Sequence, residues 1–249
     1  MALMAITPHI EDVHNFLSHC HKKPYSKGTT IIYEGDECDT LYYIIDGSVS
    51  VILEDEDGKE VVISYLNVGD FFGEIGLFKK VEERSAWCRA RTNCNIAEIS
   101  YSNFNNYVTN HPEIVFTIGE QMASRLRNTT RKLGDLAFYD VTGRIARTLI
   151  ELSKEPDALT HPDGMQIMIT RQEIGRLVNC SREMAGRVLK TLEEQDLISV
   201  SGKTIVVFGT ANPFISTLSC CTGGELDAER TRSVSLIRLK NARDVCVHY

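Results

Sequence analysis

One stretch of the sequence carries charged side chains where its neighbours predict a buried segment. In FFGEIGLFKKVEERSAWCRA, residues 71–90, apolar residues dominate both ends. Inside it lie Gly73-Glu74 and Arg84-Ser85, a charged residue beside a small one, twice. Acids and arginines are seldom buried without a partner, so these residues need an explanation. One explanation is a buried ion pair between Glu74 and Arg84, and the other is a ligand that both of them bind.

A second stretch carries charges that suit nucleic acid. TRQEIGRLVNCSREMAGRVLKTLEEQDLI predicts two helices joined at NCS, with Thr170 capping the first in a capping box with Glu173. Ser181 caps the second helix, which begins with Arg182 and Glu183 and also carries Arg187 and Lys190 outward. In a major groove arginine can donate to guanine, and glutamate can accept from cytosine. The alternative is a surface helix with solvated charges, but the following strand pair SVSGKTIVVFG favours a winged helix-turn-helix that binds DNA.

The first charged stretch lies in a segment that predicts β-structure. From Lys23 to about Ser100 the chain is rich in Ile, Val, Tyr and Thr, and acid–glycine pairs interrupt it. Such pairs mark tight turns between short strands. Strands this short and this regularly spaced predict a small sandwich or jelly-roll-like barrel, and the whole chain is therefore of the α+β class.

A long helix is predicted between these two parts. Residues 112–138 contain no internal proline, and apolar residues recur every three to four positions. They are Ile114, Ile118, Met122, Leu126, Leu133, Leu136 and Ala137. A helix this long in a small protein is typical of a coiled-coil dimer, so we expect a homodimer. The predicted domains are residues 1–111, 112–138 and 139–210, followed by an atypical tail, 211–249, which is folded, flexible, or a read-through or frameshifted end.

Bulk composition restricts the function classes. The chain has 249 residues, of which 43% are apolar and 24% charged, and a net charge of −7. This charge argues against a wholly basic nucleic-acid binder, and the sequence predicts a cytoplasmic chain without a signal peptide or membrane span. No Ser-His-Asp set, metal motif or phosphate-binding loop of a hydrolase is present, so we expect neither an enzyme nor a metal site.

From about Leu17 to Thr210 the sequence resembles one family, the cyclic AMP receptor protein (catabolite activator protein) family of bacteria. The resemblance is carried by LYYIIDGSVSVILEDEDGKE, SYLNVGDFFGEIGLF, ERSAW, DVTGRIARTL, HPDGMQI, ITRQEIG, CSREMAGRVLK and GKTIVVFGT. It implies a transcription regulator that binds cyclic AMP as an allosteric ligand, binds palindromic double-stranded promoter DNA as a homodimer, and recruits RNA polymerase. The tail beyond Thr210 has no counterpart in the family.

The resemblance implies a role for each polar residue of the first stretch. Arg84 and Ser85 are expected to bind the cyclic phosphate, Glu74 the ribose 2′-hydroxyl, and Gly73 to let the backbone approach. A helix N-terminus and an arginine both favour an anion, which agrees with this assignment. Thr129 and Thr130 of the long helix are expected to contact adenine, one of them from the facing subunit.

The resemblance also implies the contacts of the helix-turn-helix. Arg182, Glu183 and Arg187 are expected to contact DNA bases. The candidates for phosphate contacts are Thr142, Thr170, Arg171, Ser181 and Lys190. The loop DALTHPDG matches the main polymerase-contact surface and consists of Asp157, Ala158, Leu159, Thr160, His161, Pro162, Asp163 and Gly164. At the position of the family's second polymerase surface, Ser102 and Asn103 replace a pair of lysines.

Relatives with other ligands remain as alternatives. An iron–sulfur sensor needs a cysteine cluster ahead of the barrel, where this chain has only Cys20. A cyclic di-GMP sensor stays open, although Glu74, Arg84 and Thr129 favour cyclic AMP. A cyclic-nucleotide-binding module without DNA binding is disfavoured by the recognition helix.

Overall fold

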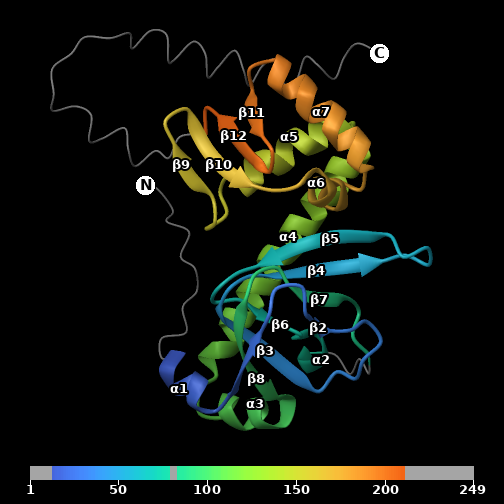
Figure 1. Cartoon of the computed structure of the whole chain (residues 1–249). Coiled ribbons are helices and arrows are strands. Elements are labelled where there is room, and N and C mark those ends of the chain that lie inside the picture. Colours follow the sequence, from blue (N-terminus) through green and yellow to red (C-terminus); the bar gives the residue numbers. More distant parts are fainter. Residues whose placement is uncertain (1–12, 79–82, 211–249) are drawn as a thin grey trace, which may run out of the picture. The chain divides into compact units, whose positions relative to one another are not determined.

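The computed structural model describes residues 13–78 and 83–210, which form two compact units (Figure 1). The first unit runs to Lys132 and the second begins at Leu133, so both share the long helix α4, Glu113–Phe138. The predicted atypical tail, 211–249, lies outside the described residues.

The first unit contains two four-stranded antiparallel sheets. One has the order β1 (His21–Tyr25), β8 (Cys94–Ser100), β3 (Thr40–Asp46) and β6 (Phe71–Phe72). The other has the order β2 (Thr30–Ile32), β7 (Trp87–Ala90), β4 (Val49–Glu54) and β5 (Glu60–Leu66). The predicted jelly-roll-like β-structure is thus a double sheet, in which β4 and β5 form the predicted hairpin.

Alternation along the strands gives the first sheet two buried faces. On one face Ile44 and Phe72 share a core with Val49 of the second sheet. On the other face Leu41 and Tyr43 share a core with α1 (Val13–Ser18), α3 (Tyr101–Val108) and the start of α4. A short helix of this unit, α2 (Ile75–Phe78), directly follows Gly73-Glu74.

The long helix α4 is present as predicted, but its apolar residues divide between two faces. Ile114 and Ile118 are each 1% exposed and belong to the core of the first unit. These two residues of the predicted apolar period therefore fill the first unit's own core and are not available to a dimer seam.

The second unit is a winged helix-turn-helix. It comprises α5 (Val141–Leu152), β9 (Leu159–His161), β10 (Gly164–Met168), α6 (Arg171–Val178), α7 (Arg182–Glu194), β11 (Ile198–Ser201) and β12 (Thr204–Phe208). The strands form one sheet in the order β11-β12-β10-β9, and Gly202, at a φ of +64°, lies at the tip of the wing. Strand β9 was not predicted, since the segment was interpreted as a loop.

Candidate functional site

The backbone at Gly73 fits only a glycine. Its φ is +75°, which L side chains rarely adopt. A Cβ atom there would lie 2.8 Å from Arg84 Nη1 and 3.2 Å from the Thr40 carbonyl oxygen. Gly73 therefore allows the strand end at β6 and the arginine to approach each other closely.

The Arg84 guanidinium is buried and held by neutral groups. Nη1 donates to the Gly73 carbonyl at 3.0 Å and to the Tyr101 hydroxyl oxygen at 3.2 Å, and Nη2 donates to the Thr40 carbonyl at 2.7 Å. The Tyr101 hydroxyl itself donates to the Gly73 carbonyl. Burial raises the pKa of Tyr101, so this phenol stays neutral. Within the described residues, these bonds leave the Nε–H group and one Nη2–H group of Arg84 for a ligand.

Arg84 has no carboxylate partner within residues 13–78 and 83–210, although only 7% of the residue is exposed. A buried cation is costly unless an anion or several hydrogen bonds compensate it. The three bonds to oxygen dipoles compensate part of the charge, and an anion would complete the compensation. The buried Glu74–Arg84 ion pair considered from the sequence is not formed.

Glu74 is paired instead with an arginine of α4 that the sequence did not single out. Arg125 Nη1 donates to Glu74 Oε1 at 3.0 Å, and its Nη2 donates to the Phe71 carbonyl. Glu74 is 8% exposed and the Arg125 side chain 23% exposed, so this ion pair is partly buried. Its second carboxylate oxygen is available to accept a hydrogen bond, for example from a sugar hydroxyl. The 51-residue separation of the two partners explains why no local pattern indicated Arg125.

The surroundings of the pair limit the charges at this site. Burial raises the pKa of Cys88 to about 12, so that thiol stays neutral. Burial also raises the pKa of Asp70, and the nearby Arg125, 3.8 Å away, opposes this increase only in part. Arg84 is thus the side-chain cation here that no carboxylate in the described residues neutralises.

Thr129 and Thr130 lie on α4 and are exposed in the single chain. Thr129 donates to the Arg125 carbonyl at 2.9 Å, and Thr130 donates to the Leu126 carbonyl at 2.9 Å. Thr129 therefore sits one helical turn beyond Arg125, about 6 Å along the axis from the residue that holds Glu74. The two predicted adenine contacts are near the Glu74–Arg125 pair in sequence and helix position but do not bond to it.

An exposed apolar face runs along α4. Phe116, Leu126 and Leu133 are 81%, 69% and 67% exposed. With Gly119, Ala123, Thr130 and Ala137, they alternate at spacings of three and four residues, which is the pattern of a coiled-coil seam. Thr130 thus lies in the same face as the two leucines, between them.

The turn of the helix-turn-helix is fixed by its caps. The Thr170 hydroxyl accepts a hydrogen bond from the Glu173 amide at 3.1 Å. The Ser181 hydroxyl accepts one from the Met184 amide, also at 3.1 Å. Asn179 ends α6 in the left-handed conformation, with a φ of 54°. A Cβ on Gly175 would lie 2.6 Å from the Cys180 carbonyl oxygen, so the turn packs directly on α6.

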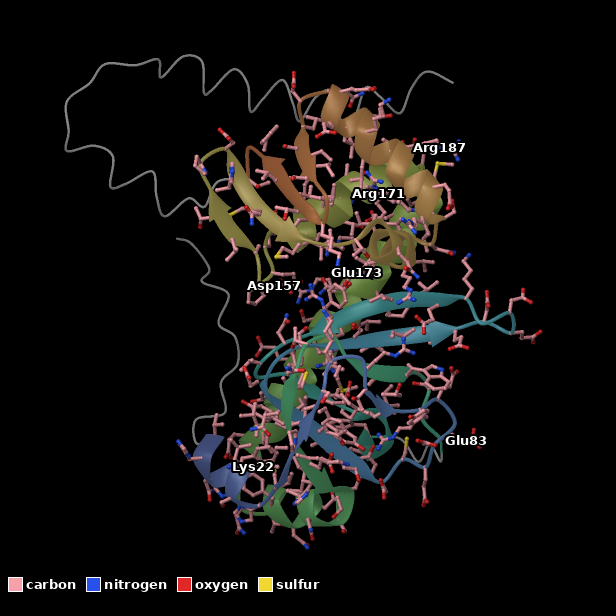
Figure 2. The ribbon with its side chains drawn as sticks, viewed as in Figure 1. Lys22, Glu83, Asp157, Arg171, Glu173 and Arg187 are labelled. Atoms are coloured by element: carbon pink, nitrogen blue, oxygen red, sulfur yellow. The ribbon has the colours of Figure 1, made fainter. Side chains whose placement is uncertain are left out.

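The outward face of α7 carries the predicted DNA contacts. Arg182, Glu183, Arg187 and Lys190 are exposed, whereas Ala185, Val188 and Leu189 are buried. Figure 2 shows the side chains of Arg171 and Arg187 on this part of the second unit. The Arg171 side chain lies along α7 at Gly186, where a Cβ would be 3.5 Å from its Cδ. Both helices therefore contribute cations to this region.

Most of the remaining predicted residues are exposed or partly exposed on the second unit. Thr142 lies in the first turn of α5, and Lys190 pairs with Glu194 at 3.7 Å. In the segment Asp157–Gly164, Asp157, Thr160, Pro162 and Asp163 are exposed and Leu159 is 56% exposed, whereas Gly164 is buried. The His161 ring lies 3.6 Å from the Asp163 carboxylate.

The described ranges lack two further kinds of feature. They hold no group of three or more His, Cys, Asp or Glu side chains that could bind a metal ion. No helix in these ranges is long and apolar enough to cross a membrane.

Two family models match the chain. A cyclic nucleotide-binding domain matches residues 22–111, and a Crp-like helix-turn-helix domain matches residues 143–208. Together with the fold, they define a class of protein in which a ligand-binding double sheet precedes a DNA-binding domain.

Curated and solved relatives identify the family. The chain is 60% identical to the cAMP-activated global transcriptional regulator Vfr of Pseudomonas aeruginosa, over 84% of this chain and 100% of that protein. It is 60% identical to the cAMP-activated global transcriptional regulator CRP of Salmonella typhimurium, over 78% of this chain and 93% of that one. A solved structure of CLP from Xanthomonas campestris, described as a c-di-GMP responsive global regulator, is 48% identical with a TM-score of 0.75, over 80% of this chain and 98% of CLP. The chain belongs to the CRP family of transcription regulators, which are not enzymes.

Proposed function

We propose that the protein is a cyclic AMP-dependent, dimeric transcription regulator that binds palindromic promoter DNA and recruits RNA polymerase. The observation that carries the ligand part is the buried Arg84, which lacks a carboxylate partner in the described residues. A cyclic phosphate monoanion would supply the missing charge. The curated relatives at 60% identity are described as cAMP-activated, which supports this ligand.

In this site each residue has a proposed role. Arg84 and Ser85 bind the phosphate, and Gly73 allows the close approach. The second carboxylate oxygen of Glu74 accepts a hydrogen bond from the ribose 2′-hydroxyl, while the hydrogen bond from Arg125 orients the carboxylate. Thr129 and Thr130 bind adenine, and Thr130 does so from the facing subunit because it lies in the exposed apolar face of α4.

The DNA part rests on the outward face of α7. Arg182, Glu183 and Arg187 read bases in the major groove. The phosphate contacts are Thr142, Thr170, Arg171, Ser181 and Lys190. Segment Asp157–Gly164 contacts RNA polymerase. Because promoter DNA and RNA polymerase reside in the bacterial cytoplasm, the protein acts there.

The homodimer forms through the exposed face of α4, which contains Phe116, Leu126 and Leu133. Apolar side chains this exposed on one long helix are favourably buried by a second copy. A dimer also brings two copies of α7 to a two-fold symmetric site, with half-sites about one helical turn of DNA apart.

Cyclic di-GMP is the second candidate ligand, because the 48% identical CLP is described as responsive to it. Titrating the purified protein with cyclic AMP, cyclic GMP and cyclic di-GMP by calorimetry separates these ligands. We expect cyclic AMP to bind at least about tenfold more tightly than cyclic di-GMP, since one buried guanidinium matches one phosphate. We also expect it to bind more tightly than cyclic GMP, since the 60% identical relatives are described as cAMP-activated. Tighter binding of cyclic di-GMP would replace the proposed ligand.

A further inference from the structure

The chain between α4 and α5 is held by two arginines of α5. Arg144 Nη1 donates to the Tyr139 carbonyl at 3.0 Å, and its Nη2 donates to the Val178 carbonyl at 3.4 Å. Val178 is the last residue of α6, the first helix of the helix-turn-helix pair. Arg144 therefore joins the α4–α5 connection to the DNA-binding helices within the second unit.

The second arginine, Arg147, joins the same connection to the end of α4. Its Nε donates to Asp135 Oδ2 at 3.0 Å, and Asp135 lies in the last turn of α4. Its Nη1 lies 3.4 Å from the Tyr139 hydroxyl, and its guanidinium lies 5.0 Å from the centre of the Tyr139 ring. One side chain thus contacts both the end of α4 and the residue that follows it.

The packing around Tyr139 depends on a small neighbour. A Cβ on Gly143 would lie 3.2 Å from Tyr139 Cδ1 and 3.3 Å from its Cβ. Gly143 also donates its amide to the Asp140 side chain, the N-cap of α5, at 2.8 Å. Gly143 at the start of α5 therefore leaves room for the Tyr139 side chain, which Arg147 also contacts.

We propose that Asp135, Tyr139 and Arg147 form a hinge clamp, whose residues are positioning residues for communication between nucleotide and DNA. The clamp rests on the proposed function, because it needs a nucleotide effect to transmit. With it, the last turn of α4, α5 and α6 move as one body through Arg147 and Arg144. Without it, the connection bends more freely, so a change along α4 selects less strongly among orientations of the DNA-binding helices.

Arg147→Gln tests the clamp in the full-length protein. The quantity measured is the coupling factor, which is the ratio of specific-site DNA affinity with and without saturating cyclic AMP at fixed salt. We expect this factor to fall by about threefold or more. Cyclic AMP affinity without DNA and nucleotide-free, non-specific DNA binding should stay unchanged. Lys154→Gln removes a positive charge from an exposed position of the same unit and should leave the coupling factor unchanged.

A double-mutant cycle distinguishes a clamp from separate effects. Asp135→Asn should lower the coupling factor about as much as Arg147→Gln, and the double variant should lower it no further. An unchanged coupling factor in Arg147→Gln, or fully additive losses in the double variant, would overturn the clamp. Absence of coupling in the unmodified protein would instead contradict the proposed function, so the two failures are distinguishable.

Discussion

Replacing Arg84 with leucine is expected to abolish cyclic AMP binding. The guanidinium is the buried cation at the site that no carboxylate in the described residues neutralises, and leucine can neither bind a phosphate nor donate to the Thr40 and Gly73 carbonyls. Loss of a charge-assisted pair of this kind costs on the order of 3 kcal/mol or more, roughly a 100-fold loss of affinity. Calorimetric titration with cyclic AMP measures this loss of affinity.

A control separates lost binding from lost folding. Arg89 lies on β7 and pairs with Glu60 at 2.8 Å, so Arg89→Leu removes the same charge from a strand of the same unit without touching the Gly73-Glu74 step. Circular dichroism and thermal melting should show that both variants remain folded. Near-normal cyclic AMP affinity in folded Arg84→Leu would refute the assignment of the phosphate site.

Charging the exposed face of α4 is expected to produce a monomer. Leu126 and Leu133 are exposed in the single chain, so aspartate at both positions disturbs little within the protomer. In a dimer seam the two carboxylates would be buried against their counterparts without a partner. The Leu126→Asp, Leu133→Asp variant should sediment as a monomer at micromolar concentration, and its affinity for a two-fold symmetric DNA site should fall by about 100-fold or more.

Asn128→Asp is the matched control for this variant. It places the same charge on the same helix, at an exposed position two residues from Leu126 and outside the three-and-four pattern of the seam. It should remain a dimer. A double aspartate variant that still sediments as a dimer would show that the subunits associate through another surface.

The sequence predicted those features that depend on neighbouring residues. Turns at Gly35, Gly47, Gly58 and Gly69 follow from acid–glycine or glycine–acid pairs, and all four glycines have positive φ. At Gly47 a glycine is also needed for steric reasons, because a Cβ there would lie 2.4 Å from the Asn93 carbonyl oxygen. The caps of α6 and α7 were predictable for the same reason, since each cap bonds an amide three residues ahead.

Features that depend on distant residues were missed. The partner of Glu74 is Arg125, which reaches it from another element, and no spacing rule connects them. The apolar period of α4 could not tell Ile114 and Ile118, which fill the core, from Leu126 and Leu133, which are exposed. A helix that is apolar on two faces shows one merged pattern in sequence. The short elements α1, α3 and β9 carry too few residues for a period to show.

Cyclic AMP binding and specific DNA binding are expected to be energetically coupled in this protein. The most direct test measures the affinity of the protein for a palindromic site over a cyclic AMP titration at fixed salt, because salt alone changes DNA affinity strongly. We predict that saturating cyclic AMP tightens specific binding by about tenfold or more, roughly 1.4 kcal/mol of coupling, and that DNA tightens cyclic AMP binding by the same factor. A specific-site affinity that does not change with cyclic AMP would contradict the account and make the protein a ligand-independent regulator.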